Sequence, residues 1–203
     1  METENSHAYF AGKTVKSIHY INNEIDLTKS VFGSQLVKRT DTVVLKFNKK
    51  GFEMSDETMK LLSKTRKSMK KVHKIVIEGH FRKDLTDTGL KDLGRSLIRL
   101  SSLKSIKLVF FDCMRITDEG LKSINESLKR LGCLQSINLD IKGSGNITDG
   151  SVKKISKTLQ RLPSLHSLHL NLATESITDE GLQKISESLD KIRFELLARP
   201  RHR

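Results

Sequence analysis

The chain has no tryptophan and only two prolines, two cysteines and two tyrosines among its 203 residues. Two cysteines cannot form a disulfide framework, and their scarcity favours a reducing compartment. The hydrophobic fraction of 36% is low, and with so few prolines it indicates a thin, repetitive core and much solvated surface rather than a compact enzyme. We therefore expect an intracellular protein, cytoplasmic or nuclear.

Several functional signals are also missing. No apolar run approaches the eighteen or so residues of a membrane span, and residues 1–7 lack the features of a secretory signal. No Ser, Cys or carboxylate has the setting of a catalytic group. His166 and His169 lie three apart on an expected strand, so their side chains face opposite ways and cannot share a metal. The sequence predicts a protein that is not an enzyme and that has no catalytic residues, metal or cofactor.

What the chain does have is a repeat. Ile116-Thr117-Asp118-Glu119-Gly120-Leu121 reappears as Ile177-Thr178-Asp179-Glu180-Gly181-Leu182, and weaker copies begin at 54, 85 and 147. The five starts are separated by 31, 31, 31 and 30 residues. A fixed period of this length is typical of a solenoid, in which each repeat contacts only its neighbours.

Residues 116–146 show how one repeat is built. Thr117 is a good N-cap, and Asp118 and Glu119 place negative charge beside the positive end of the helix dipole. An apolar stripe with helical spacing follows, formed by Leu121, Ile124, Leu128 and Leu131. The alternation in 136–140 then predicts a short strand.

The same layout predicts strands over 43–48, 74–78, 105–109 and 167–171, with a further candidate at 16–21. Residues 1–40 are expected to form an N-terminal cap or a partly ordered segment. At the other end, Glu195 and Ala198 fall where a next strand needs apolar residues, so we expect the array to end in a helix. The solenoid is then 41–197, followed by a basic tail, 198–203.

One strand per repeat implies parallel strands, and helices need more room than strands about 4.8 Å apart. We expect an α/β solenoid, a short curved arc with strands on the concave face and helices on the convex face. Leu103-x-x-Ile106-x-Leu108, followed by Cys113-x-x-Ile116-Thr117-Asp118-Glu119-Gly120-Leu121, resembles the leucine-rich repeat in its cysteine-containing form. The 31-residue period resembles the ribonuclease-inhibitor-like type.

This resemblance implies a protein-binding surface on the concave strands and their following loops. The outward positions of the strands supply the candidate residues, which are mixed polar: Lys46, Lys74, Glu78, Ser105, Lys107, Ser136, Asn138, Asp140, Ser167, His169 and Asn171. An adaptor, or a subunit of a larger assembly, is the function that this surface favours. The cysteine-containing form also implies an alternative, the substrate-receptor arm of a ubiquitin ligase that lacks its own F-box.

Phe110 and Phe111 follow the third strand, and either one is exposed as an anchor or both line the core. Cys113 and Cys133 are expected to be buried structural residues. The partner protein and the oligomeric state have no signature in the sequence.

A second surface comes from the charge, which is +13 overall. Residues 49–83 contain eleven Lys/Arg against four acids, whereas 116–146 contain four of each. Helical spacing would place four lysines on one convex face: Lys60, Lys64, Lys67 and Lys71. This basic stripe is either an ordinary solvated face or a contact for phosphates or acidic protein. The second reading makes the chain a component of a nucleic-acid-containing particle that docks through 49–83.

Overall fold

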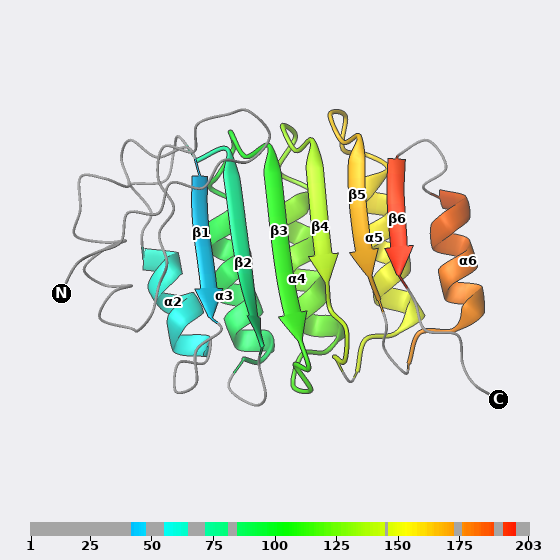
Figure 1. Ribbon diagram of the computed structural model, residues 1–203, viewed down its shortest axis with the longest axis horizontal. Coiled ribbons are helices and arrows are strands. Elements are labelled where there is room, and N and C mark those ends of the chain that lie inside the picture. The colour runs from blue at the N-terminus through cyan, green and yellow to red at the C-terminus, as the bar shows by residue number, and fades with distance from the viewer. Residues whose placement is uncertain are drawn as a thin grey trace.

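The computed structural model describes residues 42–47, 55–64, 72–80, 85–144, 146–172, 176–188 and 193–197. In this part of the chain, six strands form one sheet in the order β1-β2-β3-β4-β5-β6, and every neighbouring pair is parallel. Figure 1 shows the middle helices behind the sheet and the first and last described helices beyond its two edges, with no described helix in front of it. The expected α/β repeat arc is confirmed.

Strands and helices alternate along the chain. The strands are β1 (Thr42–Phe47), β2 (Lys74–His80), β3 (Ser105–Phe111), β4 (Ser136–Asp140), β5 (Ser167–Asn171) and β6 (Arg193–Leu197). The helices are α2 (Asp56–Lys64), α3 (Asp87–Leu97), α4 (Asp118–Leu128), α5 (Asp149–Leu159) and α6 (Asp179–Ser188). The candidate strand at 16–21 and the predicted cap and tail lie outside the described residues.

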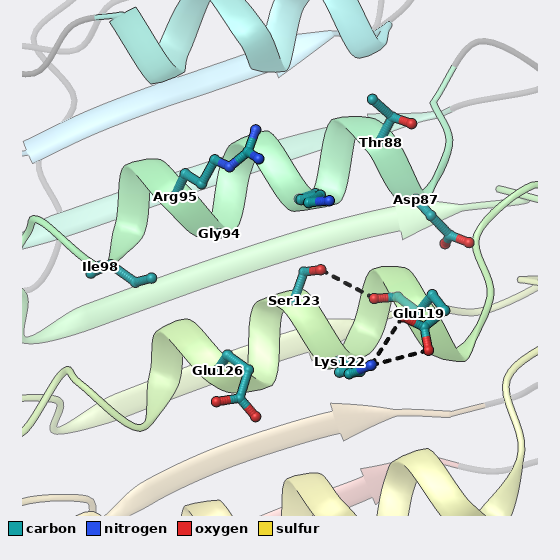
Figure 2. Close-up of a pocket in the computed structure, with 10 residues that line it drawn as sticks. Asp87, Thr88, Gly94, Arg95, Ile98, Glu119, Lys122, Ser123 and Glu126 are labelled. Atoms are coloured by element: carbon teal, nitrogen blue, oxygen red, sulfur yellow. Dashed lines mark hydrogen bonds and ion pairs between the residues drawn. The ribbon is translucent and has the colours of Figure 1, made fainter.

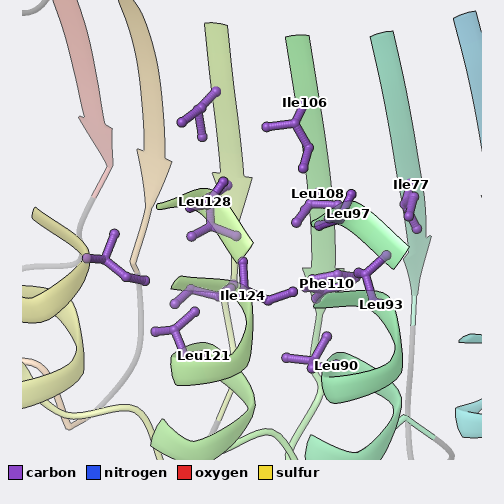
Figure 3. Close-up of a cluster of buried hydrophobic side chains, with 14 of the residues drawn as sticks. Ile77, Leu90, Leu93, Leu97, Ile106, Leu108, Phe110, Leu121, Ile124 and Leu128 are labelled. Carbon is purple, nitrogen blue, oxygen red and sulfur yellow. The ribbon is translucent and has the colours of Figure 1, made fainter. Parts of the chain in front are cut away.

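The core is one continuous layer between the strands and the helices. Leu90, Leu93 and Leu97 of α3 face Ile106 and Leu108 of β3, and all five are almost completely buried (Figure 3). The equivalent positions of α4 and β4 extend the same layer. Because each helix presents one apolar stripe to the sheet, the opposite face of the sheet remains available for other contacts.

An aspartate joins each helix start to the next. The Asp87 carboxylate accepts hydrogen bonds from the Thr117 backbone N–H (2.8 Å), the Thr117 hydroxyl (2.7 Å) and the Gly120 backbone N–H (3.0 Å). Asp56 makes the same three bonds to Thr86 and Gly89. The corresponding aspartates of α4 and α5 bind the threonine of the next repeat, Asp118 to Thr148 and Asp149 to Thr178. We call this recurring contact the aspartate clamp.

The clamp explains the glycine of the motif. A Cβ atom at Gly120 would lie 2.4 Å from an oxygen of Asp87, and one at Gly181 would lie 2.2 Å from an oxygen of Asp149. In α5 a serine takes this position, and the Ser151 hydroxyl bonds to the Asp118 carboxylate instead. Burial favours a higher pKa for Asp118, but the bonds from Thr148 and Ser151, with the charge of Lys154, hold that pKa below its ordinary value.

The two ends of the clamp series differ. At α2, the first helix of the described residues, Ser55 and Thr58 cap each other, with the Thr58 N–H donating to the Ser55 hydroxyl at 3.3 Å. At the last helix, Asp179 is exposed and has no hydrogen bond among the described residues. The series therefore runs from Asp56 to Thr178, and Asp179 carries the motif without the contact.

The prediction that the array ends in a helix is wrong, because β6 follows α6 and pairs with β5. Phe194 and Leu196 stand in register with Leu168 and Leu170. The step from Leu168 to Phe194 is 26 residues, whereas the step from Ile137 to Leu168 is 31. Extrapolating the period therefore placed the apolar positions too late in the chain.

Candidate functional site

The open face of the sheet carries three rows of side chains, each row crossing the strands. Ser105, Ser136 and Ser167 are in register and half-buried. The second row is Val76, Lys107, Asn138 and His169, and the third is Glu78, Val109, Asp140 and Asn171. Parallel in-register pairing thus brings the predicted concave residues of successive repeats together.

Two pairs within these rows are already bonded to each other. Lys107 Nζ lies 2.5 Å from a carboxylate oxygen of Glu78, so each charge has a partner of opposite sign. The Asn171 side-chain amide donates to Asp140 at 3.1 Å, and both residues are only 8% exposed. The Lys142 backbone N–H donates to the other Asp140 oxygen at 3.1 Å. Asp140 and Asn171 therefore stiffen the face, and they offer little surface to a partner.

The accessible part of the face is smaller than the sequence predicted. Lys74 is exposed, and the three serines, Lys107, Asn138 and His169 are half-buried. The Asn138 side-chain oxygen is shielded from solvent and has no hydrogen-bond partner. A buried acceptor of this kind gains when a donor is brought to it. Lys46 belongs to β1, and its side chain lies outside the described residues.

The two phenylalanines differ in their burial. Phe110 is 1% exposed and packs in the core, so it cannot serve as an anchor, whereas Phe111 is half-buried. The large exposed apolar side chain of this loop is Met114, which is 61% exposed and follows Phe111 by three residues. The candidate apolar contact beside the concave face is therefore Phe111 with Met114.

The two cysteines also differ. Cys113 is buried as expected, and burial followed by the nearby Asp112 charge raises its pKa to about 12. Such a thiol is not a nucleophile at neutral pH. Cys133 is exposed, so the expectation that it is buried is wrong. It lies in the turn after α4, where no strand or helix stripe covers it.

Only part of the basic stripe lies among the described residues. Lys60 is exposed on α2 and forms an ion pair with Glu57 at 3.4 Å. The side chain of Lys64, and all of Lys67 and Lys71, lie outside the described residues. The four-lysine face thus stays a prediction, and its first member already has a carboxylate partner.

A groove of about 510 Å³ lies between α3 and α4 on the convex side (Figure 2). It exists where Gly94 allows close approach, since a Cβ there would lie 2.8 Å from the Ser123 carbonyl oxygen. Its walls balance three cations against three carboxylates: Lys91, Arg95, Lys122, Asp87, Glu119 and Glu126. This balance gives the groove no preference for a ligand of either charge.

Two further features concern the described ranges alone. No three His, Cys, Asp or Glu side chains there gather closely enough to hold a metal ion. None of the helices described is both long and apolar enough to cross a bilayer.

Sequence reasoning missed the aspartate clamp, although its signal was present. Each copy of the motif has an Asp directly after a Thr, or after a Ser in the first copy. From the sequence alone we predicted only that this carboxylate stabilises the dipole of its own helix. The contact reaches instead to the Thr and Gly of the following repeat, about thirty residues later. The recurrence of all three residue types at one period was the signal that pointed to a contact between repeats.

In comparisons with known proteins, no protein-family model matches the chain, and no curated protein matches it. The class of protein is defined by the structure itself, as parallel strand–helix repeats with one open sheet face.

Proposed function

We propose that the chain is a leucine-rich-repeat protein that binds another protein through its concave strands and the loops that follow them. It acts as an adaptor or as a subunit of a larger assembly. The observation that carries this proposal is the sheet face that no described helix covers, on which half-buried polar side chains from successive repeats stand in register.

The size of the face limits the kind of contact. Six strands about 4.8 Å apart, taken over the five residues that all of them share at about 3.3 Å per residue, span roughly 400 Å². A standard interface buries about 800 Å² on each partner. The loops after the strands must therefore contribute, and the loop with half-buried Phe111 and exposed Met114 supplies the apolar surface that the rows lack.

The chemistry of the face indicates how a partner is recognised. Hydroxyl, amide and imidazole groups on Ser136, Asn138 and His169 offer hydrogen bonds, and the Lys107–Glu78 pair leaves little net charge at the centre. Recognition through this face should depend mainly on hydrogen bonding and shape, and only weakly on salt.

Affinity capture from native lysate tests the proposal, with each extract divided into nuclease-treated and untreated halves. We expect a defined set of proteins that survives nuclease and is lost with Asn138→Arg or Met114→Glu. Ser123→Arg, on the convex helix α4, is the matched control and should leave capture unchanged. Capture that is indifferent to both concave-side changes, or that disappears with nuclease, contradicts the proposal.

A further inference from the structure

A second recurring residue lies at the opposite end of the repeat. Arg99, Arg130 and Arg161 are spaced by 31 residues, and each is exposed. Each one directly follows the C-cap of its helix, α3, α4 or α5. They therefore lie along one edge of the molecule, where helices end and strands begin, at the top of Figure 1. Because packed helices are about 8–10 Å apart, this edge presents about one guanidinium group per 10 Å.

These arginines differ from three lysines of the helices. Within the described ranges, none of the three guanidinium groups takes part in an ion pair or a hydrogen bond. The three lysines, which lie nearer the helix starts, have carboxylate partners about one turn earlier: Lys60 with Glu57, Lys122 with Glu119 and Lys184 with Glu180. The arginine row is thus positive charge that the fold leaves uncompensated.

The surroundings of the row have the same sign. The segments 98–104, 129–135 and 160–166 contain five Lys/Arg and no Asp or Glu, and we call them the basic edge. Exposed Lys104, Gln135 and His166 form a second row beside the arginines. Backbone bonds hold this row together, from Gln135 N to Lys104 O at 2.8 Å and from His166 N to Gln135 O at 3.1 Å.

A cation at the end of a helix also stabilises the helix dipole, by about 0.3–1 kcal/mol. The helix dipole explains why each of the three helices ends at a positive charge. It does not explain why the three neighbouring segments of the basic edge contain no carboxylate. Lys129, which is paired with Glu126, already gives α4 a cation at its C-cap, and Arg130 adds a cation without a partner among the described residues. The accumulation of charge across repeats therefore needs a further reason.

We propose that the basic edge binds the phosphate backbone of a nucleic acid. Guanidinium groups bind phosphate oxygens in bidentate fashion, and a regular row of them follows a regular line of phosphates. The segments of the basic edge contain no aromatic residue, so contact is with the backbone and is independent of base sequence. This surface is separate from the concave face, so the inference does not rest on the proposed function. It adjoins residues 49–83, because the His73 carbonyl oxygen accepts a hydrogen bond from the Lys104 N–H at 2.7 Å.

The test measures binding of a short fluorescein-labelled RNA single strand and of a DNA duplex by anisotropy, over a series of salt concentrations. Each phosphate contact contributes roughly −0.7 to −0.9 to the slope of log K against log salt. The triple variant Arg99→Gln/Arg130→Gln/Arg161→Gln should therefore make the slope shallower by roughly 2 to 3 units. Replacing the same residues with Lys keeps the charge and should restore most of the slope.

The matched control is Lys60→Gln/Lys122→Gln/Lys184→Gln, which removes the same total charge from cations that have carboxylate partners. We expect it to bind as the wild type does, and the thermal melting of every variant confirms that it is folded. An unchanged slope in the arginine variant overturns the proposal, and so does an equal loss in the control. The proposal would also be overturned if polyglutamate at equal charge displaced the labelled strand. The edge would then bind any polyanion and would not recognise phosphate groups.

Discussion

At the scale of single residues, the Thr-Asp-Glu-Gly motif combines two functions. Thr117 caps its own helix by accepting from the Glu119 N–H at 3.2 Å, and it donates its backbone and hydroxyl protons to Asp87 of the repeat before. Asp118 in turn accepts hydrogen bonds from the backbone N–H and the hydroxyl of Thr148 in the next repeat. The motif therefore recurs because each copy completes its neighbour, and the register between repeats is set by hydrogen bonds to a charged group as well as by apolar packing.

Asp87→Ala tests this account. The change removes three hydrogen bonds and leaves the N–H groups of Thr117 and Gly120 without their acceptor, so we expect a loss of about 2–3 kcal/mol in the free energy of unfolding. Asp179→Ala is the control from the same motif, and it should cost less than about 1 kcal/mol, the contribution of the helix dipole alone. Urea denaturation measures both changes. Equal losses at the two positions would show that the clamp adds nothing.

At the scale of elements, one small residue lies at the contact between two neighbouring helices. Gly94 of α3 faces the Ser123 carbonyl of α4, and the equivalent positions of the next two helices are Asn125 and Ser156. The contact between α2 and α3, where Ser63 takes the equivalent position, is as extensive as that between α3 and α4, so the extent of contact does not follow from this residue alone. The side-chain oxygen of Asn125 is buried without a hydrogen-bond partner. Gly94 therefore allows the close approach of α3 to α4 beside the groove of Figure 2.

Gly94→Ala should destabilise the protein by about 1–3 kcal/mol, although alanine is the better helix former, because its Cβ would meet backbone that cannot move alone. Gly132→Ala is the control, since a Cβ there has no atom within 4 Å. Differential scanning calorimetry of the two variants decides the matter. A melting temperature for Gly94→Ala at or above that of the wild type would contradict the packing account.

At the scale of the whole molecule, the two edges of the solenoid at which strands and helices begin and end carry charges of opposite sign. The clamp aspartates lie where strands end and helices begin, and the basic edge lies where helices end and strands begin. This arrangement follows the dipoles of helices that all point the same way. The core separates the two edges, and the concave face, with its Lys107–Glu78 pair, lies between them with little net charge. Three surfaces of different chemistry thus meet on one small arc.

The carboxylate edge makes stability depend on acid. The pKa of folded Asp118 lies below its ordinary value of 3.8, so its stabilising effect is present above pH 3.8 and is lost as the pH falls through the folded value. Asp118→Asn should therefore show a smaller drop in melting temperature than the wild type on acidification below that pH. Melting curves recorded across this range test the sign, and parallel profiles for the two proteins would contradict it.

Much of the fold follows from local patterns, and its deviations come from longer-range geometry. The helix stripe at Leu121 and Ile124 and the alternation in β4 are local, so the sequence located both elements. The strand at 193–197 was missed because the final step shortens to 26 residues, which periodic extrapolation cannot anticipate. The concave positions were predictable from alternation. The bonding of Asp140 to Asn171 was not, because it depends on which side chains of adjacent strands meet.

The most direct test of the central claim places a photo-reactive amino acid, p-benzoylphenylalanine, at Ser136 on the concave face or at Ser123 on convex helix α4. Each protein is irradiated in native lysate, and the cross-linked products are identified by mass spectrometry. The account predicts a defined protein adduct at position 136, and it predicts that the same protein is not cross-linked from position 123. Adducts that form from Ser123 while Ser136 stays unmodified would show that the partner binds the helical side, and would contradict the assignment of the concave face.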